Sequence, residues 1–198
     1  MQVVQVTTQE RSDLGKKATK ALRKSGHIPA VVYSKNGVTH FSTTHGDVKK
    51  LIYTADLKLA ELHLTEGAKK ALIKDIDFHP VTDEILHIDF IELIPNHSVK
   101  ANVPIKFKGT SPGVKAGGKL ISGLRTVKVK TTPEVLVDEL FVDISSLQLS
   151  EAVRVRDLEL PDGLTVEVDP ATPIAVVEVP RALKSAKAAA DGEDGVEE

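Results

Sequence analysis

The pattern of apolar and polar positions predicts a chain built mainly of β-strands. Alternating or β-branched segments of the first half predict strands at residues 2–8, 30–34, 38–44, 57–64, 70–78 and 85–93. Good helix formers predict a helix over residues 16–25 that ends before Gly26, and Asp47 is placed to cap a short helix over residues 48–53. Strands and short helices in this number indicate a small closed barrel or a strongly curved sheet.

The second half alternates in the same way, with more frequent Pro and Gly breaks. Strands are expected at residues 99–108, 124–131, 135–144, 152–160, 164–169 and 173–179, and the pattern predicts an antiparallel β domain. Polar, turn-prone residues 95–99 predict a linker, so we expect one domain at residues 1–95 and a second at 96–181. Residues 182–198 are rich in Ala, Gly and acids and are predicted to be a disordered tail.

Composition excludes several classes of function. The 198 residues include no Cys, which excludes disulfides, thiolate zinc sites and cysteine nucleophiles. No apolar run approaches the roughly 18 residues of a membrane span, and the start lacks a signal-peptide core. Metal-ligand spacings, nucleophile elbows and phosphate loops are missing, and the glycine-rich residues 113–118 are predicted to be a flexible surface loop. We therefore expect an intracellular protein that is not an enzyme, with no membrane partner, no cofactor, no metal and no small-molecule substrate.

The net charge argues against a nucleic-acid partner, whereas the distribution of charge along the chain favours one. The formal net charge is -2, whereas nucleic-acid binders usually carry a basic excess. Residues 11–50, however, hold nine bases and two acids. A helix bearing several Lys and Arg neutralises phosphates, although a solvated basic face is a common alternative. The lack of nearby acids and the polar-tipped Tyr33 favour RNA, and these residues alone leave both interpretations open. Aromatic residues make up only 4%, which disfavours a stacking platform for single strands.

One strand, residues 85–93, places a possible site on its polar side. With a period of two, Leu86, Ile88 and Phe90 face the core, and His87 and Asp89 lie as neighbours on the other side. An imidazole beside a carboxylate can hydrogen-bond a polar ligand, but a solvated face with a local pair is the commoner outcome. The two residues supply at most two metal ligands, so a metal site is not expected.

Four segments together resemble one known family. They are GKKATKALRKSGHIPAVVYSKNG (residues 15–37), LIKDIDFHPVTDEILHIDFIEL (72–93), VKANVPIKFKGTSPGVKAGGKLISGLR (99–125) and PDGLTVEVDPATPIAVVEVP (161–180). In this order they resemble the bacterial large-subunit ribosomal proteins that bind 5S ribosomal RNA (rRNA). The two-domain length resembles the long form of that family, also called the general stress protein Ctc. The resemblance covers essentially residues 1–180.

The resemblance implies a fold and a function. It implies a mainly β protein with a few short helices: an N-terminal six-stranded β-barrel, a C-terminal antiparallel β domain and a disordered acidic tail. The first domain is expected to bind the loop E region of 5S rRNA in the central protuberance, and the second to touch rRNA and neighbouring ribosomal proteins of the large subunit. Structured RNA is read by shape, backbone and minor groove, which suits a curved sheet with a basic helix. The protein would be a structural component of the cytoplasmic ribosome.

Residues of this chain that match the family's motifs are expected to contact RNA. They are Arg11, Gly15, Lys16, Lys20, Arg23, Lys24, Tyr33, Lys74, His79, His87 and Asp89. The chain departs from the family pattern at Lys17, Lys20, Ala21, Ser34, Lys74 and Phe78. Among these, Ala21 and Phe78 stand where many members have a base, and Lys20 replaces the bidentate fork of an Arg with a point charge. Two fewer bases imply weaker binding with a shallower salt dependence, and we expect binding to survive because most positions on the face remain.

Two alternatives come from other classes of function. The protein can be a stress-linked regulatory protein with partial ribosome occupancy, which co-sedimentation with the large subunit in growing and stressed cells would distinguish. It can also be a hydrolase or metalloenzyme that uses His87 and Asp89, in which case the pure protein would contain stoichiometric metal.

Overall fold

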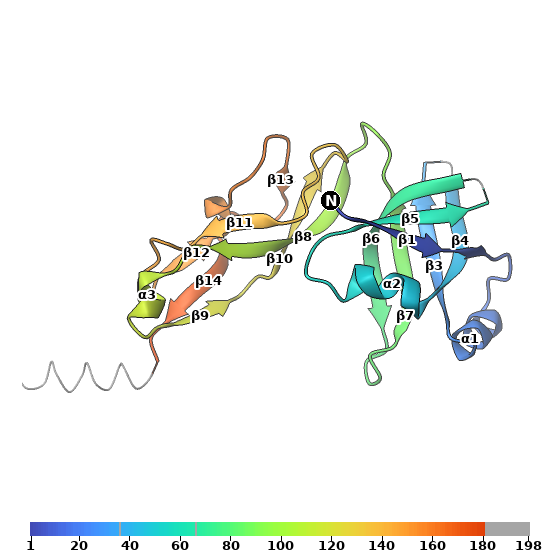
Figure 1. Cartoon of the computed structure of the whole chain (residues 1–198), viewed down its shortest axis with the longest axis horizontal. Coiled ribbons are helices and arrows are strands. Elements are labelled where there is room, and N and C mark those ends of the chain that lie inside the picture. Colours follow the sequence, from blue (N-terminus) through green and yellow to red (C-terminus); the bar gives the residue numbers. More distant parts are fainter. Residues whose placement is uncertain (36, 66, 181–198) are drawn as a thin grey trace, which may run out of the picture. The chain divides into compact units, whose positions relative to one another are not determined.

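The computed structural model describes residues 1–35, 37–65 and 67–180 and confirms a mainly β protein (Figure 1). Two compact units are formed. The first comprises Met1–Val103, Lys128–Asp138 and Pro161–Thr165; the second comprises Pro104–Val127, Glu139–Leu160 and the residues from Val166 on. The domain boundary expected near residue 95 stays a prediction. The predicted tail at 182–198 lies outside the described residues.

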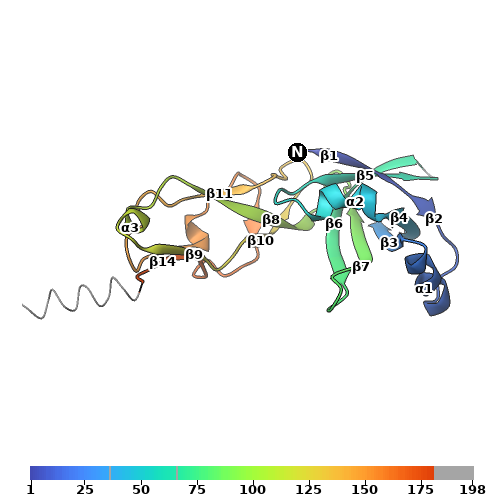
Figure 2. The ribbon, with the colours of Figure 1, turned by 60° about the horizontal axis from the view of Figure 1, so that its bottom comes forward.

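A sheet of seven strands forms most of the first unit. The strands are β1 (Val3–Thr7), β2 (Gln9–Glu10), β3 (His27–Ser34), β4 (Gly37–Thr44), β5 (Leu59–Leu64), β6 (Gly67–Phe78) and β7 (Ile85–Glu92). Their order is β1-β5-β6-β7-β3-β4-β2. Strands β1 and β2 are the two edges of the sheet, and only Thr8 separates them along the chain, so the sheet curls into a barrel (Figure 2). Because β1 and β2 act as one interrupted strand, the predicted six-stranded barrel is confirmed.

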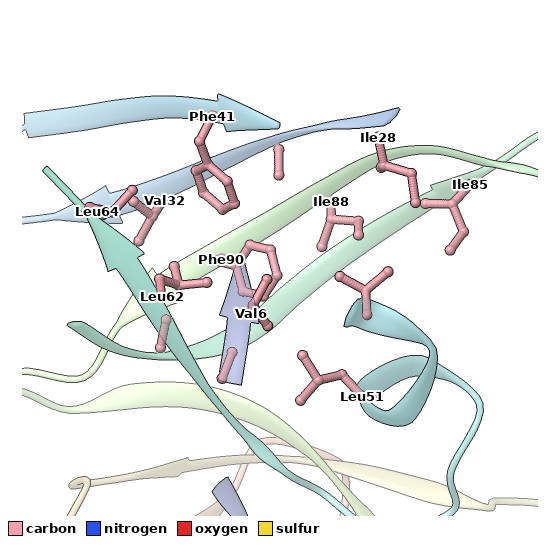
Figure 3. Packing of buried hydrophobic residues seen from close by; sticks show 14 residues of the cluster. Val6, Ile28, Val32, Phe41, Leu51, Leu62, Leu64, Ile85, Ile88 and Phe90 are labelled. Carbon is pink, nitrogen blue, oxygen red and sulfur yellow. The ribbon is translucent and has the colours of Figure 1, made fainter. Parts of the chain in front are cut away.

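Inward-facing residues of the strands fill this barrel (Figure 3). The rings of Phe41 and Phe90 are fully buried, and their centroids lie 5.7 Å apart. Ile88 and Phe90 face inward as predicted. Leu86 does not join this core and is only half-buried. The register of β6 and β7 shifts between Asp77 and Phe78, which leaves Leu86 without a paired residue. The side chain of Leu86 therefore does not follow the inward–outward alternation of the strand.

Two helices accompany the barrel. The predicted basic helix is α1 (Lys16–Lys24), which ends before Gly26 at φ +80°. Helix α2 (His45–Ile52) begins earlier than predicted and buries Val48 and Leu51. The expectation that Asp47 caps this helix was wrong, because the Oγ1 of Thr44 accepts the Asp47 N–H at 3.4 Å. In the described ranges, no helix has the length and apolarity to cross a membrane.

The strands that follow the barrel form two smaller sheets. One has the order β11-β8-β10-β13 and the other the order β12-β14-β9. Their bounds are β8 (Val99–Lys108), β9 (Lys119–Ser122), β10 (Thr126–Thr131), β11 (Leu140–Asp143), β12 (Ala152–Arg154), β13 (Thr165–Val166) and β14 (Pro173–Glu178). Strands β8 and β11 pair in parallel. Several strands are shorter than expected. Strand β12 ends at Arg154, because the Asp157 carboxylate accepts the Arg154 N–H and the chain turns into the 3₁₀ helix η1 (Val155–Asp157).

The glycine-rich segment expected to be a flexible loop contains a short helix, α3 (Pro112–Lys115). The buried Ser111 Oγ accepts the Val114 N–H at 3.3 Å and donates to the Leu147 carbonyl. A Cβ atom on Gly113 would lie 2.6 Å from the backbone carbon of Gln148, and one on Gly118 would lie 2.5 Å from Val177 Cγ1. Both glycines are therefore required by close packing, which sequence periodicity does not reveal.

Replacement of Gly113 by alanine should lower the free energy of unfolding by about 1–3 kcal/mol, because backbone atoms of the Gln148 segment must move to admit the methyl group. Gly123→Ala is the matched control, since the nearest atom to its Cβ is Pro173 O at 3.5 Å, and it should change stability by less than about 0.5 kcal/mol. Urea unfolding of the full chain measures both. Equal effects of the two substitutions would contradict the packing argument.

Candidate nucleic-acid interface

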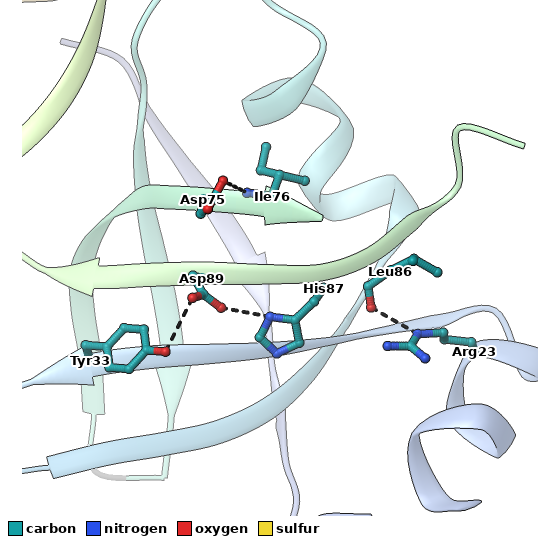
Figure 4. A network of polar contacts seen from close by, with 7 residues as sticks. All are labelled: Arg23, Tyr33, Asp75, Ile76, Leu86, His87 and Asp89. Atoms are coloured by element: carbon teal, nitrogen blue, oxygen red, sulfur yellow. Dashed lines mark hydrogen bonds and ion pairs between the residues drawn. The ribbon is translucent and has the colours of Figure 1, made fainter. Parts of the chain in front are cut away.

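Three polar side chains meet on the outer face of the barrel (Figure 4). The parallel pairing of β3 with β7 places Val31 beside Asp89 and Tyr33 beside Ile91, which brings Tyr33 close to Asp89 on the outer face. The Tyr33 hydroxyl donates to Asp89 Oδ2 at 3.3 Å, and His87 Nδ1 lies 2.8 Å from Asp89 Oδ1. The side chains of His87 and Asp89 are 26% and 24% exposed, so the group is accessible from outside.

Asp89 fixes the chemistry that its two neighbours present. Its negative charge, followed by partial burial and the hydrogen bond, raises the pKa of Tyr33, so the hydroxyl stays protonated at neutral pH. Since that proton points to Asp89, the Tyr33 oxygen presents lone pairs outward. In the same way, Nδ1–H of His87 faces Asp89 and leaves Nε2 for an outside partner. The predicted pair of His87 and Asp89 is therefore a hydrogen-bonded group, and Tyr33 belongs to it.

A β-bulge adds a cation to the same face. The register of β6 against β7 shifts between Ile73 and Asp75, so Lys74 is the extra residue. Its Nζ lies 4.7 Å from the centroid of the Tyr33 ring, a cation–π contact. Asp75 and Asp77 lie opposite Asp89 and His87, and Asp75 Oδ1 accepts the Ile76 N–H at 2.9 Å (Figure 4). These carboxylates make the face less basic than its lysine suggests.

Helix α1 supplies most of the positive charge. Its five cations, Lys16, Lys17, Lys20, Arg23 and Lys24, are all exposed, and the helix buries none of its residues. Arg23 Nε donates to the Leu86 carbonyl at 3.0 Å, at the residue that the β7 irregularity leaves unpaired (Figure 4). This bond ties the helix to β7 next to His87. Gly15 occupies the N-cap with extended backbone and no side-chain cap.

Arg11 lies in a setting that sequence reasoning did not foresee. Its backbone N–H donates to the His40 carbonyl at 3.1 Å. Burial, and then the charge of Arg23, lowers the pKa of the Arg11 guanidinium below its usual value. Within the described residues, Arg11 Nε and His40 Nδ1 are buried and make no hydrogen bond. His40 of β4 pairs with Val31 of β3. Its place on a strand of the same sheet is the one feature of the sequence that could have suggested His40 as part of this surface.

His79, another expected RNA contact, makes its hydrogen bonds within the turn that joins β6 to β7. Its Nδ1 accepts the N–H groups of Val81 and Thr82 at 3.3 and 3.2 Å. Its backbone N–H donates to the Glu84 carbonyl at 2.8 Å. The structure therefore gives His79 a role in shaping the hairpin. Across residues 1–35, 37–65 and 67–180, no group of three or more His, Cys, Asp or Glu is placed to hold a metal ion.

These observations define a class of protein. A curled sheet that presents a rigid hydrogen-bonding group, flanked by an exposed basic helix, is the kind of surface with which proteins bind structured RNA.

Comparisons with known proteins agree with this class. The Ribosomal L25p family matches residues 6–90, and the C-terminal domain of ribosomal protein TL5 matches residues 98–181. The large ribosomal subunit protein bL25 of Cytophaga hutchinsonii is 36% identical over 190 residues, which cover 96% of this chain and 98% of the relative. That of Porphyromonas gingivalis is 39% identical over 188 residues (94% and 97%), and that of Amoebophilus asiaticus is 34% identical over 192 residues (97% of each).

The chain therefore belongs to the ribosomal L25p family, and the resemblance found in its motifs is confirmed. Its two matched regions correspond to the long form with a TL5-type C-terminal domain. Membership makes it a structural protein of the large ribosomal subunit and not an enzyme. In bacteria, proteins of this family are part of the cytoplasmic ribosome.

Proposed function

We propose that this chain binds 5S rRNA at its loop E region, in the central protuberance, through the outer face of the barrel. The observation that carries the proposal is that one carboxylate, Asp89, holds Tyr33 and His87 together beside the exposed helix α1. Membership of a large-subunit ribosomal protein family supports RNA as the partner.

The proposed role of each group of residues follows from its chemistry. The cations of α1 neutralise phosphates by releasing counterions, and this supplies affinity that falls with added salt. Arg23 uses Nε for the Leu86 carbonyl and keeps its terminal nitrogens for a phosphate. Tyr33 and His87 present a lone pair and a ring nitrogen to 2′-hydroxyls and base edges in a shallow minor groove.

The remaining residues that are expected to contact RNA have supporting roles in this proposal. Gly15 and Lys16 begin the basic helix, Lys20 and Lys24 extend its charge, and Arg11 lines one pocket together with residues of this helix. Lys74 adds a cation over Tyr33. His79 shapes the hairpin between β6 and β7. Residues 96–181 are proposed to contact rRNA and neighbouring ribosomal proteins.

A titration of the full chain against two RNAs tests the proposal. The first RNA is intact 5S rRNA, and in the second RNA loop E is replaced by a regular Watson–Crick helix of equal length. We expect at least about tenfold weaker binding to the second, since loss of one or more base-edge contacts costs about 1–3 kcal/mol each. Binding to both RNAs should weaken with salt. Equal affinity for the two RNAs, or affinity for intact 5S rRNA that is independent of salt, would contradict the proposal.

A further inference from the structure

A pocket of about 380 Å³ lies at the end of the barrel where the parallel strands β3 and β7 begin. Its lining comes from the end of α1, the start of α2, the start of β3 and the hairpin that leads into β7. The buried core residues Ile28 and Ile85 form its apolar wall (Figure 3). This volume is in the range of sites that hold small molecules. Of the residues proposed to contact 5S rRNA, only Arg23 lines this pocket.

The hairpin gives the pocket two carboxylates on a backbone of defined shape. The His79 carbonyl accepts the Asp83 N–H at 3.0 Å, and the Glu84 carbonyl accepts the His79 N–H at 2.8 Å. Asp83 has a φ of +54°, in the left-handed region that Asp and Asn adopt more readily than most residues. The side chains of Asp83 and Glu84 are exposed, and an ionised carboxylate can only accept hydrogen bonds. One wall of the pocket is therefore rich in acceptors.

His27 adds a further acceptor to this lining. The Ser25 Oγ donates its one proton to the Leu22 carbonyl at 2.7 Å, so it acts as the acceptor toward His27 Nδ1, which lies 3.3 Å away. The neutral His27 ring therefore carries its proton on Nδ1 and has a lone pair on Nε2. A second imidazole of the lining, His45, lies with its ring centroid 5.9 Å from that of the exposed Tyr53. The pocket thus combines acceptors, aromatic rings and an apolar wall.

We propose that this pocket binds a guanine nucleotide, either free or as an unpaired guanosine of RNA. The Watson–Crick edge of guanine presents two adjacent donors, N1–H and N2–H, which match the two oxygens of the Asp83 or the Glu84 carboxylate. The phosphate of the nucleotide is bound by Arg23, whose Nε donates to the Leu86 carbonyl and whose terminal nitrogens remain as donors (Figure 4). The inference goes beyond binding to 5S rRNA and does not depend on loop E.

The mixture of groups in the pocket selects this ligand over others. Adenine and cytosine each present a donor beside an acceptor on their Watson–Crick edges, and uracil presents one donor between two carbonyl oxygens, so a carboxylate meets a repulsive lone pair. A Lys or Arg side chain of a partner protein suits the carboxylates, but the Arg23 guanidinium in the same lining repels it. A guanine nucleotide uses both charges, because it carries a donor edge and an anion.

The test titrates the ¹⁵N-labelled full chain with GMP and, separately, with AMP. GMP should shift the backbone amide signals of residues 26–28 and 82–86 and bind at least about fivefold more tightly than AMP, since one good bidentate contact gives at least this discrimination between bases. Equal affinity for GMP and AMP, or signal shifts confined to other residues, would overturn the proposal. This comparison uses the unchanged chain and therefore does not depend on the folding of any variant.

A combined variant assigns the preference to the two carboxylates. Asp83→Asn with Glu84→Gln should abolish the preference for GMP over AMP, and Asn tolerates the left-handed backbone at position 83. The matched control, Asp13→Asn with Glu92→Gln, removes equal charge outside the pocket and should leave the preference unchanged. A loss of the preference in both double variants would show an effect of net charge only and would count against the site. Tighter binding of N-acetyl-arginine amide than of GMP would instead assign the pocket to a cationic side chain of a protein.

Two further probes separate the sources of the nucleotide. They are the RNA pentamers UUGUU and UUAUU, which are titrated in the same way. Binding of UUGUU at the same signals and more tightly than GMP would support an unpaired guanosine of RNA, whereas binding of GMP without UUGUU would support a free nucleotide. UUAUU should bind more weakly than UUGUU in the first case. None of these probes contains loop E, so failure of the loop E experiment would leave the results unaffected.

Discussion

Replacing Asp89 with alanine should weaken the binding of the full chain to 5S rRNA by about 2–3 kcal/mol, which is about 30–150-fold. The substitution removes the acceptor of both Tyr33 and His87, so the two groups proposed to contact RNA lose their fixed orientation together. A single base-edge contact is worth about 1–3 kcal/mol, and the loss of two oriented groups lies at the upper end of this range. Filter binding or calorimetry at constant salt measures the change.

Two companion variants make this experiment specific. Asp77→Ala removes a carboxylate that lies opposite His87 on β6 and should leave affinity unchanged or slightly higher, since it removes one repulsive charge. Tyr33→Phe removes only the hydroxyl and should cost about 1 kcal/mol. If Asp77→Ala weakened binding as much as Asp89→Ala, the hydrogen-bonded group would not be the origin of the affinity.

The alternation of single strands made much of this site predictable. A period of two was enough to place His87 and Asp89 on the side opposite the core. It did not reveal that Tyr33, 56 residues away from Asp89, would share the same carboxylate. That contact depends on the parallel pairing of β3 with β7, which is a long-range event that no local pattern specifies. Only the resemblance to a family suggested that these residues act together.

Local irregularities explain most of what the sequence did not predict. The extra residues Lys74 and Leu86 follow from register shifts between β6 and β7, and both features matter for the outer face. A shift of this kind depends on how two strands fit each other, so it leaves no signature in either strand alone. The cap of α2 was misassigned because Thr44 and Asp47 are both good capping residues and their side chains bond to each other.

The average charge conceals two basic segments of this chain. The net charge of -2 concealed the nine bases and two acids of residues 11–50, and the weakly acidic second half concealed the acid-free residues 99–131. Charge acts over about 10 Å at moderate salt, so the relevant average is taken over a surface and not over a chain. The alternation of β8 and β10 shows why: strands place every second residue of an acid-free segment on one side.

The core and the outer face should respond together when Phe90 is replaced by alanine. Phe90 is fully buried against Phe41, and its loss should lower the free energy of unfolding by about 3–5 kcal/mol through lost burial and the cavity left behind. Because Phe90 directly precedes Ile91 and follows Asp89 on β7, relaxation of this strand should also disturb the Asp89 group. We expect weaker binding to 5S rRNA at temperatures at which the variant remains folded. Urea unfolding and RNA titration measure the two effects.

Phe41→Ala separates the two consequences. Phe41 is equally buried in the same core, but it lies on β4, which contributes no residue to the Tyr33–Asp89–His87 group. It should therefore cost about as much stability as Phe90→Ala and much less RNA affinity. Equal losses of affinity would mean that the outer face depends on the stability of the barrel as a whole. A selective loss with Phe90→Ala would instead show that the packing of β7 itself holds Asp89 in place, because one strand carries the core residue and the proposed binding residue side by side.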